Sequence, residues 1–220
     1  NGYVDDYEGW NVNGNNDNHA TGNHGTNCMG MIGAKGNNTL GVAGACWNVK
    51  IMLVSGFNTS ESSVISAYTY PLEMRKQYDA TNGAKGAFVV ATSASWGIDN
   101  ADPLNYPLWC AFYDSLGVYG VLNPGATTNN NTNVDVAGDM PTACASDYMI
   151  SVTRTGNTDQ IGGGYGATTI DFGAPGINVY TTSGTNTYTT TTGTSFSCPL
   201  TAGVIGLLYS IPCNSFMTTV

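Results

Sequence analysis

Short apolar runs rich in β-branched residues alternate along the chain with longer segments of helical periodicity. The runs predicted as strands cover 50–54, 87–91, 117–122, 148–152 and 168–172. Because these runs are apolar on both faces, they are typical of a parallel sheet that is covered on both sides. The segments predicted as helices cover 25–33, 61–79, 106–116 and 199–209. This alternation predicts an α/β fold: a doubly wound, mostly parallel sheet flanked by helices on both faces.

Polar residues fill the segments between these elements. The stretch 11–24 is rich in Asn and Gly, 129–133 is almost entirely Asn, and 183–192 is rich in Thr. The Thr-rich stretch is predicted to be a surface hairpin. The acidic stretch 5–18 offers oxygen ligands of the kind that calcium prefers, but it has no complete EF-hand spacing. A solvated loop is the favoured interpretation of that stretch, and a structural calcium ion is the alternative.

Length and charge narrow the classes of function. A chain of 220 residues is long enough for one sizeable core, so a single domain over 1–220 is predicted. The formal net charge is −9, with only 6 Lys and Arg residues. Phosphate contacts need clustered basic side chains, which excludes nucleic-acid binding through a basic surface and disfavours anionic membranes. Since no apolar stretch approaches the roughly 20 residues of a membrane-spanning helix, no membrane insertion is expected.

Cysteine usage bears on the compartment. The six cysteines are Cys28, Cys46, Cys110, Cys144, Cys198 and Cys213. Their number is even, and the absence of close CxxC spacing disfavours zinc ligation. One or two disulfides in a secreted or cell-surface protein is the interpretation that we favour, and six scattered buried thiols is the alternative.

The chain has only two histidines, His19 and His24. His24 opens the segment 24–34, in which a polar start is followed by small and apolar residues. This pattern places the imidazole at the exposed first turn of a helix whose later turns are buried. A histidine at a helix start is often only a surface residue, so His24 is a candidate base only in combination with other groups.

Two further segments carry candidate chemistry. Ser195 lies in Gly-Thr-Ser-Phe-Ser-Cys-Pro at 193–199, directly before an apolar helical run. Unpaired N–H groups and the dipole at a helix start favour negative charge, which suits a nucleophile, although a helix cap is the commoner use of such a serine. Asn129 follows a predicted strand, where its amide could donate to a developing oxyanion. An Asn-rich turn is the alternative there.

Together, and in this order, the three segments resemble the subtilisin-like serine proteases, the subtilases. His-Gly-Thr at 24–26 is similar to the family's histidine motif, and 193–199 is similar to its Gly-Thr-Ser-x-x-x-Pro motif. The similarity extends through 41–44 (Gly-Val-Ala-Gly), 95–97 (Ser-Trp-Gly), the Asn129 region and 174–176 (Ala-Pro-Gly), and it covers about residues 1–210. An unrelated α/β hydrolase is disfavoured, because it would need a Gly-x-Ser-x-Gly elbow that 193–197 does not provide.

The resemblance implies a secreted serine endopeptidase that hydrolyses a polypeptide substrate through an acyl-enzyme. In this reading Ser195 is the nucleophile and His24 is the general base and then the general acid. Asn129 is the oxyanion donor, beside the backbone N–H of Ser195. No cofactor is required for this chemistry.

The resemblance also implies a substrate site. Ser95, Trp96 and Gly97 are similar to the segment that pairs with an extended peptide, a form of strand addition. Ala126, Thr127 and Thr128 are similar to the opposite wall of the first specificity pocket. The two threonines stand where Ala and Gly are usual in the family, which implies a narrower or more polar pocket.

The resemblance carries two expectations for the cysteines. Cys28, four residues after His24, resembles the cysteine beneath the histidine in the proteinase K branch, and we expect it to be a buried free thiol. Cys110 and Cys144 are expected to form a disulfide.

One part of the family's pattern is missing. The family's histidine is oriented by an aspartate in an Asp-Thr-Gly or Asp-Ser-Gly motif, and no such motif precedes His24. Residues 1–11 instead resemble the stretch downstream of that motif in larger bacterial subtilases. We therefore expect that the domain lacks an amino-terminal segment with the first strand, that this segment docks at the sheet centre, and that the last carboxyl-terminal elements could be absent too. The missing aspartate favours the alternative function, a non-catalytic subtilase-fold surface or assembly module.

Overall fold

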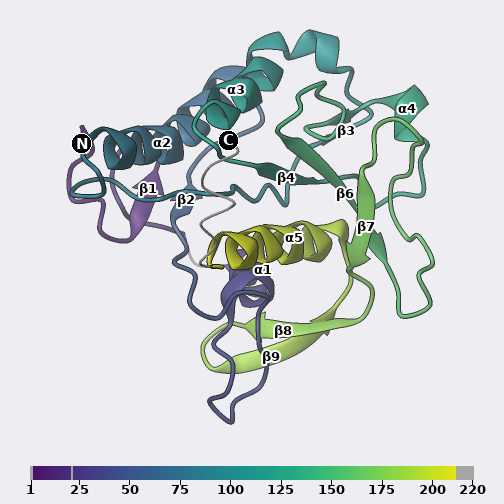
Figure 1. Cartoon of the computed structure of the whole chain (residues 1–220). Coiled ribbons are helices and arrows are strands. Elements are labelled where there is room, and N and C mark those ends of the chain that lie inside the picture. The colour runs from purple at the N-terminus through teal and green to yellow at the C-terminus, as the bar shows by residue number, and fades with distance from the viewer. Residues whose placement is uncertain (1, 21, 212–220) are drawn as a thin grey trace.

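A computed structural model of the chain describes residues 2–20 and 22–211 (Figure 1). The helices are α1 (Asn23–Gly33), α2 (Glu61–Ala80), α3 (Pro107–Gly117), α4 (Val134–Ala137) and α5 (Thr194–Tyr209), with a 3-10 turn at Pro103–Asn105. The strands are β1 (Gly9–Asn11), β2 (Leu53–Ser55), β3 (Ile98–Asp99), β4 (Asn123–Ala126), β5 (Asp139–Met140), β6 (Met149–Thr155), β7 (Phe172–Pro175), β8 (Val179–Ser183) and β9 (Thr187–Thr191).

The main sheet is parallel. β4 pairs with β6, and β6 pairs with β7. Residues 90–94 run beside β4, because the Thr92 N–H donates to the Leu122 carbonyl over 2.9 Å and the Ala94 N–H donates to the Pro124 carbonyl over 3.0 Å. β1 and β2 form a second parallel pair, while β3–β5 and β8–β9 are antiparallel.

Helices cover both faces of the sheet, with α2 and α3 on one side and α1 and α5 on the other (Figure 1). Under α3 the indole N–H of Trp109 donates to the Tyr113 hydroxyl over 2.9 Å, so a large aromatic core is buried with its polar atoms paired. On the other side Cys28 and Met31 of α1 pack against Phe196 of α5. The predicted α/β fold, with helices on both faces of a parallel sheet, is confirmed.

Four of the five strand predictions were wrong in position. The run 50–54 contributes only its last two residues to β2, and 87–91 contains no regular strand, although its end joins the bridged residues beside β4. The run 117–122 lies between the end of α3 and the start of β4, and 168–172 overlaps β7 only at its last residue. The fifth run, 148–152, matches the first half of β6.

Three helix predictions agree with the structure to within two residues, but α5 begins at Thr194, five residues earlier than predicted. Pro199 marked the expected helix start, since proline is favoured in the first turn. It lies inside the helix instead and has no N–H for the carbonyl four residues before it. That carbonyl belongs to Ser195, and it accepts hydrogen bonds from the Ser95 hydroxyl over 2.8 Å and the Cys28 thiol over 3.3 Å.

The cysteine expectations hold where they can be compared. Cys110 and Cys144 form a disulfide, and Cys28 is a buried free thiol. Burial raises the pKa of the Cys28 thiol, which keeps it neutral at neutral pH. Cys213 lies outside the described residues.

Two loop predictions had different outcomes. The Thr-rich stretch is part of the β8–β9 hairpin, as expected. The acidic stretch 5–18 is not all loop, since β1 lies within it. Within 2–20 and 22–211, no helix combines the length and the apolar character needed to cross a bilayer.

Candidate active site at the start of helix α5

The first turn of α5 holds Ser195 in place. The Ser195 hydroxyl is half-buried and donates to the Ser95 carbonyl over 3.3 Å. Of the N–H groups at the helix start, that of Thr194 is bonded to the Asn129 side chain and that of Phe196 to the Gly193 carbonyl. The Ser195 N–H has no partner among the described residues, so it remains an available donor at the positive end of the helix.

Asn129 is fixed through its side-chain oxygen. Asn129 Oδ1 accepts from the Thr194 N–H over 3.0 Å, from the Thr194 hydroxyl over 3.3 Å and from the Arg154 guanidinium. Because all three neighbours are donors, the atom that faces them must be the oxygen. The amide nitrogen, Nδ2, is then left without a partner in the described part of the chain.

His24 lies in the exposed first turn of α1, as predicted. Its ring centroid is 6.0 Å from that of Phe196, the residue after Ser195. One turn further along α1, the Cys28 thiol donates to the Ser195 carbonyl, so two residues four positions apart in α1 contact α5 beside Ser195. The imidazole makes no hydrogen bond within 2–20 and 22–211, either to the Ser195 hydroxyl or to a carboxylate.

His24 and Asn129 each contact a chain neighbour of Ser195. The His24 ring lies beside that of Phe196, and the Asn129 side chain accepts from Thr194. His19, the other histidine, does not join them: its Nδ1 lies 2.7 Å from the Ser55 hydroxyl at the end of β2. The fold thus brings together one imidazole, one hydroxyl and one carboxamide from α1, α5 and the loop after β4.

The two segments expected to bind substrate flank this point. Ser95 contacts Ser195 directly, while the Trp96 ring is stacked on Trp109 at a centroid distance of 5.3 Å. The backbone groups of Trp96 and exposed Gly97 make no backbone hydrogen bond within the described residues. Ala126, Thr127 and Thr128 are all buried between β4 and the loop that follows.

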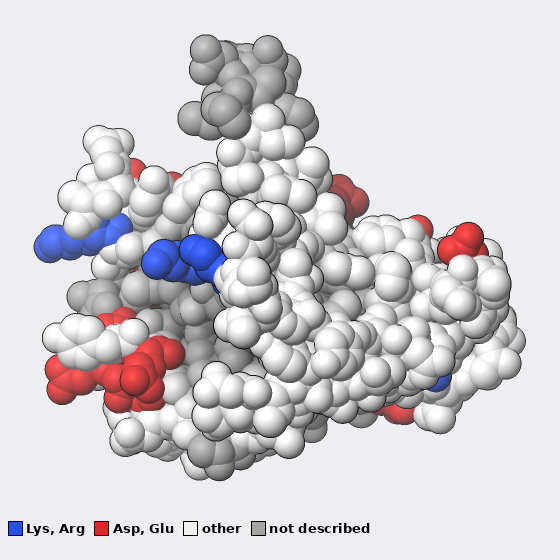
Figure 2. Space-filling model, turned by 90° about the horizontal axis from the view of Figure 1, so that it is seen from below, with Lys and Arg blue, Asp and Glu red and all other residues white. Residues whose placement is uncertain are grey.

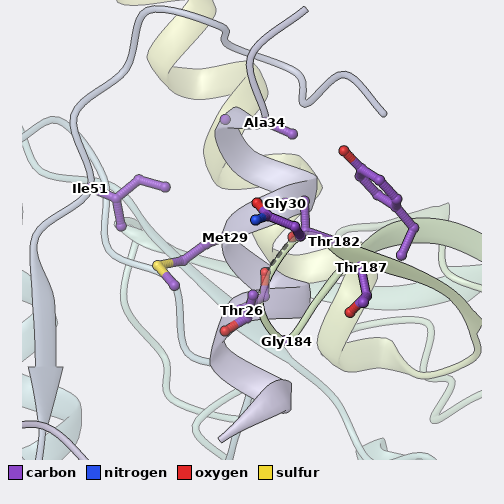
Figure 3. Close-up of a pocket in the computed structure, with 11 residues that line it drawn as sticks. Thr26, Met29, Gly30, Ala34, Ile51, Thr182, Gly184 and Thr187 are labelled. Carbon is purple, nitrogen blue, oxygen red and sulfur yellow. Dashed lines mark hydrogen bonds between the residues drawn. The ribbon is translucent and has the colours of Figure 1, made fainter. Parts of the chain in front are cut away.

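A pocket of about 350 Å³ lies next to this site, between α1 and the β8–β9 hairpin (Figure 3). Thr26 and Met29 of α1 and Thr182 and Thr187 of the hairpin line it, and the Thr182 hydroxyl donates to the Thr26 carbonyl over 2.7 Å. Its lining contains none of His24, Ser195 and Asn129. The pocket is therefore separate from the point where the catalytic candidates meet.

Two residues near the site, Arg154 and Asp139, were not predicted from the sequence. Arg154, near the end of β6, donates to both the side chain and the backbone carbonyl of Asn129, the latter over 3.1 Å. The chain has few Lys and Arg residues, so a single arginine at the carboxyl end of a strand could have indicated a residue of the site. Asp139 is buried, and it accepts from the Thr128 N–H over 3.3 Å and from the Thr142 hydroxyl. Nothing in its sequence context marked it.

No group of three or more His, Cys, Asp or Glu side chains within 2–20 and 22–211 is placed to hold a metal ion. In the acidic stretch, Asp6 accepts a hydrogen bond from the Tyr70 hydroxyl over 3.0 Å. The calcium ion considered for residues 5–18 stays a prediction.

Known proteins are similar to this chain over most of its length. Thermitase from Thermoactinomyces vulgaris is 29% identical over 203 residues, which cover 92% of this chain and 67% of thermitase. Subtilisin DY from Bacillus licheniformis is 27% identical, with 92% of this chain and 66% of that protein covered. An extracellular protease of Xanthomonas campestris is 28% identical, and the match covers 86% of this chain but 33% of that protein. The chain thus spans between a third and two thirds of the length of these relatives.

Solved structures agree with the fold. A cold-adapted subtilisin-like serine proteinase superposes with a TM-score of 0.67 at 22% identity, covering 92% of this chain and 67% of that chain. Sphericase superposes with a TM-score of 0.63 at 20% identity, covering 83% and 61%. The sequence profile of the Subtilase family matches residues 1–218. A match over nearly the whole length shows that this chain belongs to the subtilase family.

Proposed function

We propose that the chain is the catalytic domain of a secreted serine endopeptidase, with Ser195 as nucleophile, His24 as general base and Asn129 as oxyanion donor. Membership of the subtilase family supports the reaction class. The convergence of the three side chains at the start of α5 supports the assignment of roles.

The observation that carries the proposal is a pair of donors around the start of α5 that have no partner in the described part of the chain. Asn129 Oδ1 accepts from Thr194, the residue before Ser195, and from Arg154, which leaves Nδ2 as an available donor. The second donor is the Ser195 N–H at the helix start. Two preorganised donors next to a hydroxyl are what a tetrahedral oxyanion requires, because they need no rearrangement as the charge develops.

The proposed reaction follows from these positions. The Ser195 oxygen attacks the carbonyl carbon of the scissile peptide while its proton moves to a ring nitrogen of His24, and the carbonyl electrons become the oxyanion between the two donors. Collapse expels the amine, which takes the proton from His24. Water, activated by the same imidazole, then attacks the ester and releases Ser195. Before the first step, the Ser195 hydroxyl must leave the Ser95 carbonyl and turn towards His24.

A fluorophosphonate probe tests the proposal, because it modifies only a serine that a nearby base activates. We expect a single adduct on the Ser195 peptide by mass spectrometry, and none in Ser195→Ala or His24→Gln. Folded protein that gains no adduct would be the non-catalytic subtilase module instead.

We also propose that an extended segment carrying a carboxylate docks at the sheet centre and orients His24. Within 2–20 and 22–211, β2 pairs only with β1, and residues 90–94 pair only with 122–126. Each therefore presents an unpaired backbone edge, which an added strand would satisfy. A carboxylate next to the imidazole would fix its tautomer and stabilise its charged form.

Hydrogen exchange on the protein purified from its native source tests this docking. We expect slow exchange of the Ala91 and Ser93 N–H groups, which have no hydrogen-bond partner within 2–20 and 22–211, and a cross-link between this segment and an aspartate-bearing peptide. Fast exchange of both N–H groups, with no such cross-link, would contradict the docked segment.

An extracytoplasmic location completes the proposal. The Cys110–Cys144 disulfide supports it, because disulfides persist in oxidising compartments, and one relative is named an extracellular protease. Immunodetection in the culture supernatant or on the surface of the source cells tests it, and protein confined to the cytosol would overturn it.

A further inference from the structure

Two aspartates face each other across the β3–β5 ribbon. Asp99 of β3 is the direct partner of Asp139 in β5. Side chains directly opposite in an antiparallel pair project to the same face, and like charges at such positions destabilise the pair. Neither carboxylate forms an ion pair with a Lys, Arg or His of the described chain, whose salt bridges are Arg75–Asp79 and Lys76–Glu73. The arrangement therefore leaves two negative charges uncompensated.

Both carboxylates face the loop that connects β4 to Asn129. Asp139 is 1% exposed and accepts from the Thr128 N–H over 3.3 Å, whereas Asp99 is exposed and accepts from Asn130 Nδ2 over 3.1 Å. The Thr127 hydroxyl is buried beside Asp139 and lowers the pKa of that carboxyl, although its geometry is poorer than that of an ordinary hydrogen bond. The oxygen of this hydroxyl and the neighbouring carboxylate, which has no ion-pair partner in the described chain, are acceptors that a donor from outside would satisfy.

The aspartates lie between the two segments proposed to bind substrate. The first segment, Ser95 to Gly97, leads directly into β3, and the second, Ala126 to Thr128, directly follows β4. The two segments run side by side at Ala94 and Gly125 before they separate. Gly97 also touches β5, since a Cβ added to it would lie 2.0 Å from the Met140 carbonyl oxygen. Asp99 thus follows directly on the first segment, and Asp139 contacts the second through the Thr128 N–H.

Figure 2 shows that charged side chains are few on the face that it displays, where most of the surface is white. In a chain with this little charge, two aspartates without an ion pair, next to the two segments proposed to bind substrate, are a strong local feature. A cation brought there by a ligand would gain from both carboxylates, and from Asp139 in surroundings that exclude water.

We infer that the enzyme prefers substrates with Arg or Lys on the amino-terminal side of the scissile bond, with Asp99 contacting the cation and Asp139 adding a second negative charge behind it. This inference rests on the proposed function, because it names the substrate class of that same site. Asp99 is the specificity residue and Asp139 is a positioning residue.

Two internally quenched peptides that differ at one residue test the inference. One carries Arg before the scissile bond, and the other carries citrulline, which has nearly the same shape but no charge. We expect the wild-type chain to cleave the Arg peptide with a kcat/KM about 10- to 100-fold higher, the gain typical of a charged hydrogen bond. Asp99→Asn should bring the ratio close to one, and Asp139→Asn should lower it by a smaller factor.

Asp147→Asn is the matched control, since it removes the same charge from an exposed position and should leave the ratio unchanged. A wild-type ratio near one, or a ratio that neither Asp99→Asn nor Asp139→Asn alters, would overturn the inference. Asp99→Asn is on the surface, so it keeps the test valid even if Asp139→Asn does not fold.

Binding to the Ser195→Ala chain separates this inference from the proposed function. Fluorescence anisotropy should show tighter binding of the Arg peptide than of the citrulline peptide, with the preference lost in Ser195→Ala/Asp99→Asn. Equal binding of the two peptides would overturn the inference even where the fluorophosphonate adduct supports the protease. A binding preference without any adduct would support the inference and contradict the proposed reaction.

Discussion

The two sides of the candidate active site differ in how many hydrogen bonds hold their side chains in place. On the nucleophile side, Asn129 accepts hydrogen bonds from Thr194 and Arg154, and Ser195 exchanges hydrogen bonds with Ser95. On the histidine side, the ring of His24 is exposed and its described neighbour is the Phe196 ring, at 6.0 Å between centroids. The proposed oxyanion donors are therefore held by neighbouring groups, whereas the imidazole is held, among the described residues, by its helix and the Phe196 contact.

This difference indicates which steps each side can perform unaided. Preorganised donors stabilise an oxyanion whether or not the base is oriented, so the proposed charge stabilisation depends on the nucleophile side alone. Proton transfer needs the imidazole in one orientation and tautomer, which a second group normally fixes.

Ser195→Ala removes the nucleophile from the well-ordered side. Activity should fall by about 10⁶-fold in kcat, a magnitude established with subtilisin itself. Steady-state cleavage of a peptide that the wild-type chain hydrolyses measures it. Ser210→Ala, at the exposed end of α5, is the matched control and should retain activity. A residual rate within tenfold of the wild type would mean that another residue is the nucleophile.

Asn129→Ala removes one oxyanion donor while the base stays as it is. We expect kcat to fall by about 10²- to 10³-fold with little change in KM, again a magnitude taken from subtilisin, because the lost interaction exists only once negative charge develops. Asn131→Ala, two residues along the same exposed loop, is the control. A rise in KM at constant kcat would assign Asn129 to substrate binding instead.

Arg154→Gln tests how firmly the ordered side depends on its support. The variant should lower kcat by about tenfold, less than Asn129→Ala does, because the Thr194 N–H still holds Asn129 Oδ1. The double variant should be no slower than Asn129→Ala alone, since both changes act through one side chain. Losses that multiply in the double variant would show that Arg154 acts independently of Asn129.

Ionisation of Asp139 should make the free energy of unfolding depend on pH. Burial raises the pKa of its carboxyl from 3.8 to about 6. Between these values the folded chain keeps a proton that the unfolded chain has lost, so the free energy of unfolding falls as the pH rises from about 4 to about 6. The contribution is about 3 kcal/mol at most. Urea unfolding at several pH values should show a smaller fall in Asp139→Asn, while Asp147→Asn keeps the wild-type slope.

Thr182→Val addresses the histidine side and has the smallest expected effect. It removes a hydroxyl that ties the β8–β9 hairpin to the Thr26 carbonyl of α1, and it should cost about 1 kcal/mol of unfolding free energy. Thr190→Val, at an exposed position of the same hairpin, should cost less. Chemical denaturation of both variants measures the difference, and equal losses would mean that the hairpin does not stabilise α1.

The helices were predictable because their apolar spacing is local, whereas the strands were not. The run 117–122 is apolar, but α3 continues to Gly117 and Val118 is 76% exposed, so only its end approaches the sheet. Residues 87–91 have the composition of a strand, yet regular pairing needs neighbours that the sequence pattern does not reveal. Pro199 misled the start of α5 because its missing N–H is compensated by contacts from distant segments.

The candidate site divides in the same way. His24, Ser195 and Asn129 could be named as candidates from the sequence because each stands in a short motif, and their catalytic roles stay predictions. Arg154 and Asp139 could not be, because their importance comes from contacts across 25 and 11 positions, to Asn129 and Thr128. Sequence motifs indicate candidate reactive side chains, whereas the side chains that position them are identified from contacts in the folded chain.

The missing N–H of Pro199 has a consequence for how the candidate site is assembled. It leaves the Ser195 carbonyl oxygen open to the Cys28 thiol of α1 and to the Ser95 hydroxyl of the segment proposed to receive the peptide. Three segments that are distant in the sequence therefore meet at one oxygen atom. A shift of α1 or of the Ser95 segment would change the hydrogen bonding of the Ser195 carbonyl directly.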